Sequence, residues 1–271
     1  MKNILLYAGV VSVFIVGGFV SASAEILFYD DFNTETVDRD KWSMNFWDGQ
    51  LGRTTFRTLP FPEITNGNAV VTVESYNPEE GLAGNYFYGA DLKSLKLIPL
   101  KNGCTSIKIR AKMDTVMPGI VGGIFLFAFR PGSNILHDEI DFEFVTSEPD
   151  LIMTNSYSNE PLGPGQPEVA FYESGNITDY HLYEIKWESD KVSWFLDGKL
   201  IRVETEHVPA IPMEIHLNAW VTSSEWEQAY NPDFQPATTP DDNQIFGMSV
   251  DSIEVRTTSN LSPIFYLLLQ K

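Results

Sequence analysis

HDEIDFEFV, residues 137–145, is the stretch that decides the fold, because acidic and apolar side chains alternate along it. Successive side chains of a β-strand point to opposite faces of its sheet. The acids of this strand therefore share one face and the apolar residues share the other: Glu139, Asp141 and Glu143 against Ile140, Phe142 and Phe144. We expect the apolar face to pack into a core and to fix the register, because a slip of one residue would bury three acids.

The acidic face of this strand has no packing explanation. Three like charges along one strand repel one another, and acidic residues have low β-propensity. The face could be a solvated surface, or a Ca²⁺ site built from carboxylates. It also holds the groups that glycoside cleavage needs, one carboxylate that attacks and one carboxylic acid that protonates the leaving oxygen. The middle acid would then separate the pKa values of its neighbours, and we favour this interpretation.

The rest of the chain predicts an all-β fold. Short segments that alternate or run apolar are separated by Gly, Pro and Asn turns, and no segment carries a long helical stripe. Asp197-Gly198, between residues 192–196 and 199–204, is a strong β-hairpin signal. We expect an antiparallel β-sandwich of the jelly-roll, concanavalin A-like kind. The other predicted strands are residues 68–75, 105–112, 121–129, 181–188, 213–220 and 248–256.

The N-terminus has the features of a secretory signal peptide. Lys2 precedes a nearly continuous apolar run, and Ala22-Ser23-Ala24 offers a small-residue cleavage pattern, although an uncleaved anchor of this length could just span a bilayer. We expect a signal peptide at residues 1–24 and one catalytic domain at residues 25–271. The mature protein is then secreted, to the periplasm or the medium, without stable membrane insertion. The apolar segment 264–269 is too short to span a membrane.

Charge and cysteine content narrow the classes of partner. The formal net charge is −19, and residues 1–24 contribute one Lys and no acid, so the mature chain carries −19 − 1 = −20. This charge argues against nucleic acid and anionic membranes as partners. Cys104 is the only cysteine, which excludes an internal disulfide and predicts a buried small hydrophobe. The many aromatic residues fit a neutral, ring-shaped substrate, and a monomer is expected.

Other catalytic chemistries lack their motifs. The sequence has no H-E-x-x-H, no G-x-S-x-G, no clustered His and Cys with metal-ligand spacing and no phosphate-binding glycine loop. Three of the four histidines, His181, His207 and His216, are scattered, and we interpret them as surface or structural residues.

Glu139-Ile140-Asp141-Phe142-Glu143 resembles the E-x-D-x-E signature of glycoside hydrolase family 16, and within it the bacterial lichenase-type β-1,3-1,4-glucanases. The resemblance covers roughly residues 28–255. It includes Trp194-Phe195-Leu196-Asp197-Gly198, similar to the family's W-x-x-D-G hairpin. Leu217-Asn218-Ala219-Trp220 with the later Glu225-Trp226 is similar to the lichenase N-x-W segment and its E-W pair.

The resemblance implies a retaining mechanism that needs no cofactor. By position in the motif, Glu139 would be the nucleophile, Asp141 its helper and Glu143 the general acid and then the base. Physical reasoning alone does not choose which glutamate attacks. Retention requires the two carboxyl groups to lie about 5–5.5 Å apart.

The resemblance also suggests which residues meet the sugar and where a structural ion would bind. Asp251 resembles the family's structural Ca²⁺ ligand, although a plain exposed Asp fits the sequence equally. His137 stands where lichenases carry Trp, whereas xyloglucan-active relatives carry His in a similar H-D-E-I-D-F-E-F run, which leaves the glucan open. The expected substrate-binding residues are His137, Asn155, Tyr157, Asn218, Trp220 and Trp226.

We therefore expect a secreted endo-β-glucanase that hydrolyses β-1,3/1,4-glucan. Two alternatives stay open at this point. One is a xyloglucan-type transglycosylase or hydrolase, which would form the same glycosyl-enzyme. The other is a non-catalytic carbohydrate-binding sandwich, because sandwich folds host both enzymes and lectins. The presence of all three acids favours an enzyme, since binding alone needs no matched acid and nucleophile.

Overall fold

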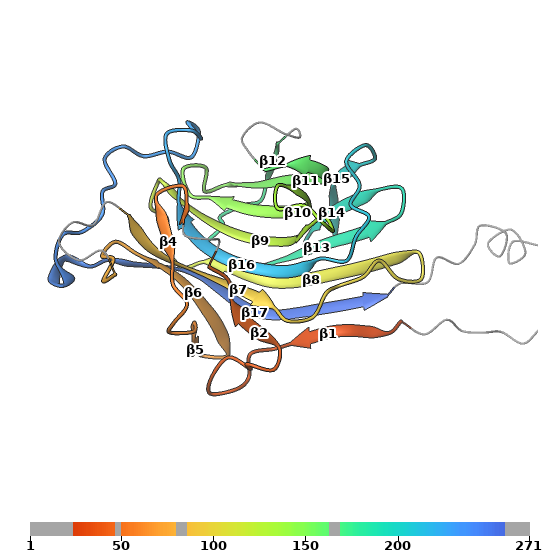
Figure 1. Ribbon diagram of the computed structural model, residues 1–271, viewed down its shortest axis with the longest axis horizontal. Coiled ribbons are helices and arrows are strands. Elements are labelled where there is room, and N and C mark those ends of the chain that lie inside the picture. The colour runs from red at the N-terminus through yellow and green to blue at the C-terminus, as the bar shows by residue number, and fades with distance from the viewer. Residues whose placement is uncertain (1–23, 47–49, 80–85, 163–168, 258–271) are drawn as a thin grey trace, which may run out of the picture.

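The computed structural model describes residues 24–46, 50–79, 86–162 and 169–257 as two packed β-sheets (Figure 1). Residues 1–23 of the predicted signal peptide and the apolar segment 264–269 lie outside these ranges. Within the described ranges, no helix is long and apolar enough to cross a membrane.

One sheet, here the front sheet, contains the acidic strand. In spatial order it consists of β2 (Trp42–Met44), β7 (Phe87–Ser94), β16 (Glu214–Val221), β9 (Ile120–Phe129), β10 (Leu136–Val145), β11 (Leu151–Pro161) and β12 (Ala170–Glu173).

The other sheet, here the back sheet, covers the apolar side of the front sheet. Its order is β5 (Glu63–Thr65), β6 (Asn68–Glu74), β17 (Ile245–Thr257), β8 (Cys104–Met113), β13 (His181–Glu188), β14 (Val192–Leu196) and β15 (Lys199–Glu204). β1 (Ile26–Asp30) pairs with β17 beyond the end of β6.

The short strands β3 (Gln50–Leu51) and β4 (Thr54–Phe56) form a hairpin near one end of the front sheet. β4 runs parallel to β7, whereas the other pairings between described strands are antiparallel. The described part also contains a 3₁₀ turn, Pro240–Asp242. The prediction of an all-β antiparallel sandwich is confirmed.

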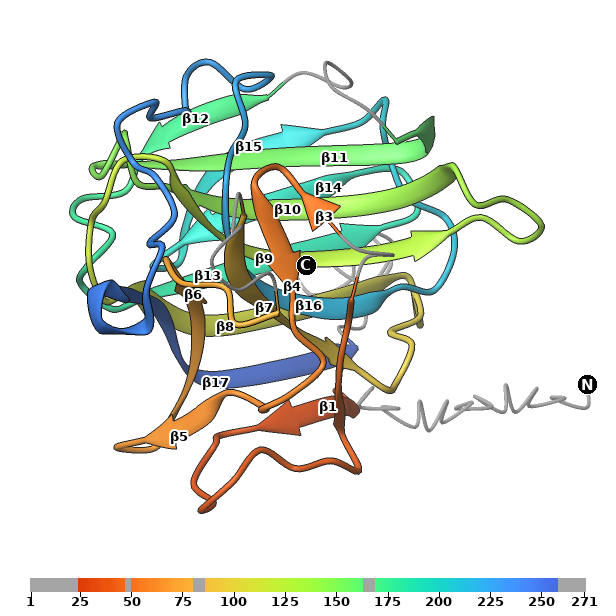
Figure 2. The ribbon, with the colours of Figure 1, turned by 60° about the vertical axis from the view of Figure 1, so that its left-hand side comes forward.

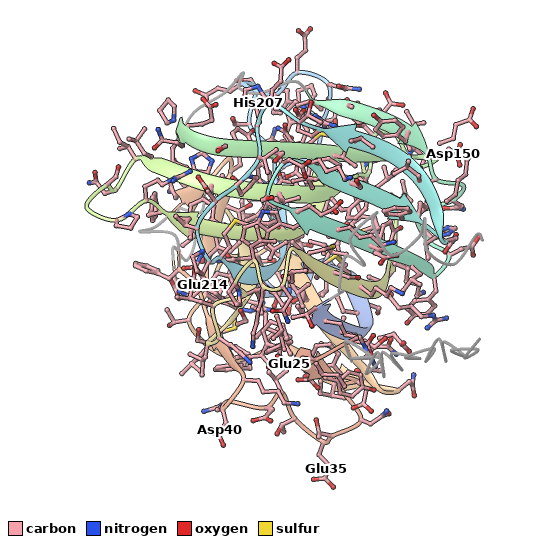
Figure 3. The ribbon with its side chains drawn as sticks, turned by 90° about the vertical axis from the view of Figure 1, so that its right-hand side faces the viewer. Glu25, Glu35, Asp40, Asp150, His207 and Glu214 are labelled. Atoms are coloured by element: carbon pink, nitrogen blue, oxygen red, sulfur yellow. The ribbon has the colours of Figure 1, made fainter. Side chains whose placement is uncertain are left out.

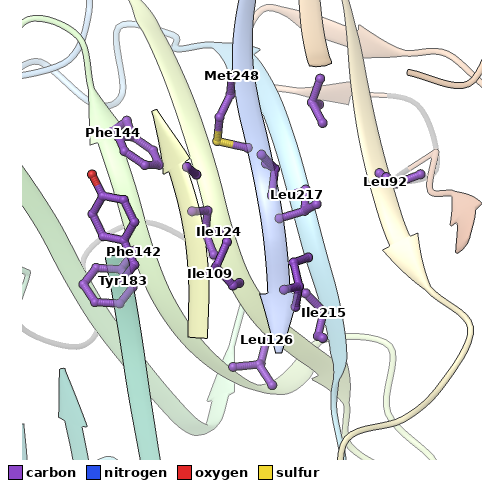
Figure 4. Close-up of a cluster of buried hydrophobic side chains, with 14 of the residues drawn as sticks. Leu92, Ile109, Ile124, Leu126, Phe142, Phe144, Tyr183, Ile215, Leu217 and Met248 are labelled. Atoms are coloured by element: carbon purple, nitrogen blue, oxygen red, sulfur yellow. The ribbon is translucent and has the colours of Figure 1, made fainter. Parts of the chain in front are cut away.

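The apolar side chains of β10 lie in the core between the two sheets. Ile140, Phe142 and Phe144 are buried, and the ring of Tyr183 from β13 packs edge-on against both phenylalanines at 5.2 and 5.1 Å (Figure 4). Burial of three such side chains contributes roughly 5–9 kcal/mol. The alternation along residues 137–145 therefore orients the strand as predicted, with its acids on the outer side of the front sheet.

Two local predictions are also confirmed. Asp197 and Gly198 both have positive φ, 49° and 79°, as a two-residue type I′ hairpin turn requires, and they join β14 to β15. Cys104 is buried at the start of β8.

The acidic residues are spread around the molecule, as Glu25, Glu35, Asp40, Asp150 and Glu214 illustrate (Figure 3).

Candidate active site

β10, which carries the three acids, lies in the front sheet between β9 and β11 (Figure 2). Residues directly opposite each other on neighbouring antiparallel strands project from the same face. The cross-strand neighbours are Phe127 and Tyr157 for Glu139, Phe125 and Asn155 for Asp141, and Gly123 and Met153 for Glu143. The acids thus sit in a strip of aromatic, amide and small residues.

A hydrogen bond and a β-bulge fix the backbone of β10, which carries the acidic row Glu139, Asp141 and Glu143. Trp194 of β14 donates its indole N–H to the backbone carbonyl of Asp141 at 2.9 Å through the core. At the start of the strand, a one-residue bulge places Asn159 of β11 out of register, with φ of 59°. These contacts restrain the backbone that carries the acids.

The side chain of Asp138 secures the bulge. It is fully buried and pairs with Arg130, whose Nε and Nη2 lie 2.7 and 2.6 Å from Oδ1. The same oxygen accepts the Asn159 N–H at 2.8 Å, and Oδ2 accepts the N–H groups of Ala210 and Ile211 at 2.7 and 3.3 Å. One carboxylate therefore joins the β9–β10 hairpin, β11 and the segment before β16. Its position in an acidic run gave no sign of this role in the sequence.

Glu139 has a hydrogen-bonding neighbour on each side along the strand. His137 Nε2 lies 3.0 Å from Glu139 Oε2. Burial, the charges of Glu139 and Glu143, and a hydrogen bond to Glu139 together raise the pKa of Asp141 well above its usual range. The raised pKa favours the protonated form of Asp141, which can donate a hydrogen bond to Glu139.

Glu143 lies beside an apolar cluster, with no described salt bridge of its own. Val145, Met153 and Trp220 belong to this cluster, which Phe56, Val121 and Ala229 complete. Burial and the negative charge of Glu139 raise the pKa of Glu143 to about 8. A carboxylic acid that stays protonated near neutral pH is the form a general acid requires.

The predicted sugar-binding residues of β11 and β16 lie on the same face. Asn155 donates from Nδ2 to the hydroxyl of Tyr157 at 2.9 Å, and burial beside the acids raises the pKa of that hydroxyl. Asn218 is opposite Gly123, whose missing side chain leaves room between Asn218 and Glu143. A Cβ at Gly123 would lie 2.4 Å from Asn218 Oδ1, so a larger residue here would displace the Asn218 side chain.

Trp220 and Trp226 form a tilted pair at the Glu143 end of the site, with ring centroids 6.0 Å apart. Trp220 is mostly buried and Trp226 is half-buried. Arg53 holds the segment that carries Trp226, because its guanidinium donates to the backbone carbonyls of Thr222, Asn231 and Phe234. The sequence did not point to Arg53.

A cavity of about 740 Å³ opens over β7, β16 and β9, and it reaches the acids only through Phe127, the cross-strand neighbour of Glu139. Its lining is mainly apolar. It includes the exposed rings of Phe46 and Phe129 and one charged pair, Lys93 and Glu214 at 3.6 Å. The remaining lining residues are Asn45, Leu97, Ala128, Pro131, Asn134, Leu162, Ile211, Pro212 and His216.

His216, which the sequence suggested as a surface or structural residue, lies on the face of the site and lines the cavity. It is buried, stacks on Phe125 at 4.8 Å, and its Nδ1 lies 3.0 Å from an oxygen of Asp91. Asn45 donates to the same oxygen at 2.9 Å. His216, Asp91 and Asn45 thus form a buried hydrogen-bond network beneath the cavity.

Asp251, the predicted calcium ligand, lies on β17 in the back sheet, far in the topology from the acids. Arg110 Nη1 approaches its Oδ1 at 3.1 Å, and Ser252 donates to its Oδ2 at 3.1 Å. Among the residues that the structure describes, no three His, Cys, Asp or Glu side chains group as a metal site. Because a guanidinium already occupies the position beside the carboxylate, this arrangement does not fit a calcium site.

Comparison with known proteins identifies the family. The sequence profile of glycosyl hydrolases family 16 matches residues 63–236, more than half of the chain. The chain belongs to this family. It is a glycoside hydrolase, as the E-x-D-x-E motif indicated, and a non-catalytic sandwich is set aside.

Relatives of similar length support this assignment. The chain is 26% identical over 240 residues to a β-glucanase of Bacillus subtilis, covering 84% of this chain and 90% of that protein. It is also 26% identical to a β-glucanase of Paenibacillus polymyxa, covering 84% and 89%.

Solved structures share the fold. The β-glucanase of Bacillus licheniformis superposes with a TM-score of 0.65 at 21% identity, covering 85% of this chain and 98% of that one. The laminarinase catalytic domain of Thermotoga petrophila gives a TM-score of 0.69 at 18% identity, covering 88% and 99%.

Proposed function

We propose that the protein is a secreted endo-β-glucanase that hydrolyses β-1,3/1,4-glucan by a retaining double displacement. Glu139 would act as the nucleophile, Asp141 as its helper and Glu143 as the acid and base. One observation carries this assignment: the two glutamates have opposite surroundings on one strand. Glu139 is next to hydrogen-bond donors, whereas Glu143 lies against an apolar cluster.

In the first step, a carboxylate oxygen of Glu139 attacks the anomeric carbon while protonated Glu143 donates its proton to the departing glycosidic oxygen. The C–O bond to the leaving sugar breaks and an ester bond to Glu139 forms. This step consumes the negative charge of Glu139, which is one of the causes that raise the pKa of Glu143.

In the second step, Glu143 acts as a base. Because the ester no longer carries a charge, the pKa of Glu143 falls when the intermediate forms, and its carboxylate can take a proton from water. The resulting hydroxide attacks the anomeric carbon and releases Glu139 as a carboxylate. Two inversions at the same carbon give net retention.

The substrate class follows from the surface around the acids. The cavity next to Phe127 combines exposed aromatic rings with a few polar side chains, an arrangement that suits a neutral sugar chain. A net charge of −19 disfavours anionic polysaccharides. Relatives named β-glucanase and laminarinase support β-glucan, and their low identity is the reason that the linkage needs direct measurement.

The test is reducing-sugar release from barley β-glucan, laminarin and xyloglucan by the wild type and by Glu139→Ala. We expect cleavage of at least one glucan by the wild type alone, and ¹H NMR of the first product should show the β-anomer. Exogenous azide should restore bond cleavage in Glu139→Ala on an aryl glycoside and give an α-glycosyl azide. Initial α-anomer from the wild type would exclude retention.

A xyloglucan-type transglycosylase remains the second candidate, because His137 contacts Glu139 in an H-D-E-I-D-F-E-F run. The two reactions differ in whether water or a sugar hydroxyl attacks the glycosyl-enzyme. Incorporation of a labelled oligosaccharide acceptor into polymer would favour the transglycosylase.

A further inference from the structure

His137 lies between two fixed partners at the end of the acidic row. Its Nδ1 is 2.8 Å from the backbone oxygen of Glu160, and its Nε2 is 3.0 Å from Oε2 of Glu139. A carbonyl oxygen only accepts, so Nδ1 carries a hydrogen. If Nε2 also carries one, the ring is an imidazolium and both of its N–H groups are used.

The ring has little freedom to leave this position. It stacks on Phe127 with centroids 5.3 Å apart and packs against Tyr157 at 4.9 Å. Both aromatic residues are the direct cross-strand neighbours of Glu139. Only 2% of His137 is exposed, which leaves little of it to contact a sugar.

The charges around the ring favour its protonated form. Burial alone lowers the pKa of His137, but the hydrogen bond and charge of Glu139, the Glu160 carbonyl and the charge of Asp138 outweigh it and raise that pKa. On its own strand His137 faces Glu139, while Asp138 is already paired with Arg130. From β11 it meets the neutral hydroxyl of Tyr157, and the carboxylate of Glu160 is engaged by His207.

We propose that His137 is a positioning residue that donates from Nε2 to Glu139 and keeps this nucleophile ionised and correctly oriented. The inference rests on the proposed role of Glu139. With Asp141 donating from the other side, Glu139 is held between two donors. A charge-assisted hydrogen bond is about twice as strong as a neutral one, so the imidazolium is the stronger partner.

Loss of His137 should have a consequence that a purely structural residue would not produce. Without the His137 imidazolium, Glu139 should take up a proton more readily than it does in the wild type. The enzyme then loses nucleophilic activity at a higher pH than the wild type does, so the acid limb of its pH profile moves upward.

The experiment measures kcat/KM against pH with 2,4-dinitrophenyl β-laminaribioside for the wild type, His137→Phe and His137→Gln. Dinitrophenolate leaves without protonation, so the acid limb reports the nucleophile and not Glu143. Phe keeps the stacking, and Gln keeps a neutral donor. We expect kcat/KM of His137→Phe to fall roughly 10- to 100-fold, the fold-change expected for a hydrogen bond to a charged group.

The pH profile and the KM separate positioning from folding. We expect the acid limb to move to higher pH in both variants, with a smaller rate loss in His137→Gln and a change in kcat larger than that in KM. A second measurement uses the imidazole ¹⁵N shifts of His137, which should titrate at higher pH in the wild type than in Glu139→Gln. This measurement compares the wild type with Glu139→Gln, so it does not depend on whether a His137 variant folds.

Unchanged rates and acid limbs in both variants, or identical His137 titration with and without the Glu139 charge, would overturn the inference. Activity of Glu139→Ala without azide would instead overturn the nucleophile assignment, and His137 with it. If Glu139→Ala is inactive and rescued by azide while the His137 variants behave as wild type, the proposed function stands and the role of His137 fails.

Discussion

Replacing Asp138 with Ala tests whether one buried carboxylate holds the catalytic strand in place. Its two oxygens accept from Arg130 and from the three backbone N–H groups of Asn159, Ala210 and Ile211. The truncation removes all of these acceptors at once and leaves a guanidinium without its partner. Breaking a buried ion pair in this way costs about 3–5 kcal/mol.

For a domain of this size, about 1 kcal/mol lowers Tm by roughly 2–4 °C, so we expect a decrease of about 6–20 °C. Urea unfolding followed by tryptophan fluorescence measures the free energy of unfolding directly, and the protein has six tryptophans as reporters. Asp40→Ala is a suitable control, because Asp40 is exposed and should stay within about 0.5 kcal/mol of the wild type.

A double-mutant cycle with Arg130→Ala separates the ion pair from the backbone contacts. We expect a coupling energy of about 1–3 kcal/mol between Asp138 and Arg130. The backbone hydrogen bonds should make Asp138→Ala more destabilising than Arg130→Ala. An Asp138→Ala protein within about 1 kcal/mol of the wild type would refute the reasoning, since those N–H groups would then find other acceptors without cost.

Three further outcomes follow from the site. Because the folded pKa of Glu143 is raised from 4.5 to about 8, the native state binds more protons than the unfolded state between these values, so the free energy of unfolding should decrease as pH rises through this window. Polymer cleavage, which needs protonated Glu143, should decline only as the pH rises through about 8. Glu143→Gln should flatten the stability slope in urea titrations at several pH values. Gly123→Ala should displace Asn218 and cost about 1–3 kcal/mol, with a raised KM for glucan; a KM equal to that of the wild type would show that Asn218 has room to shift. Excess EDTA or added CaCl₂ should leave Tm unchanged. Arg110→Ala should lower the free energy of unfolding by less than about 1 kcal/mol, because the Arg110–Asp251 pair is partly exposed. A clear rise of Tm with calcium would instead support Asp251 as a calcium ligand.

The sequence predicted the face of each residue in β10, because a strict alternation leaves one register that buries the apolar side chains. It did not predict β11 as a strand, although Asn155 and Tyr157 were selected by resemblance. The inward side of β11 is polar after Ile152: Arg202 donates to the Thr154 carbonyl, and Ser156 donates to the carbonyl of His207. This part of the strand carries no hydrophobic alternation, and the groups that satisfy it, Arg202 and His207, are about 50 residues away in the chain.

Asp138 and His137 show a second limit of prediction. In the sequence both residues precede the acidic motif, and although alternation places Asp138 on the apolar face, nothing there shows what would pair with a buried carboxylate. Its burial depends on Arg130 and on backbone N–H groups from β11 and from the segment before β16. The contact of His137 Nδ1 with the Glu160 carbonyl likewise depends on the bulge at Asn159, which sets that pairing. Sequence spacing does not encode a bulge, so the immediate surroundings of the nucleophile required the structure.

The acidic row is itself a source of instability. Raised pKa values of Asp141 and Glu143 mean that the folded protein disfavours their ionised forms, a cost that grows as the pH rises. The opposite side of the same strand offsets this cost through the buried aromatic core and the Trp194 hydrogen bond to the Asp141 carbonyl. Substitutions in the row can therefore raise stability while they remove activity. Such a trade-off is expected where function requires an arrangement that folding alone would not select.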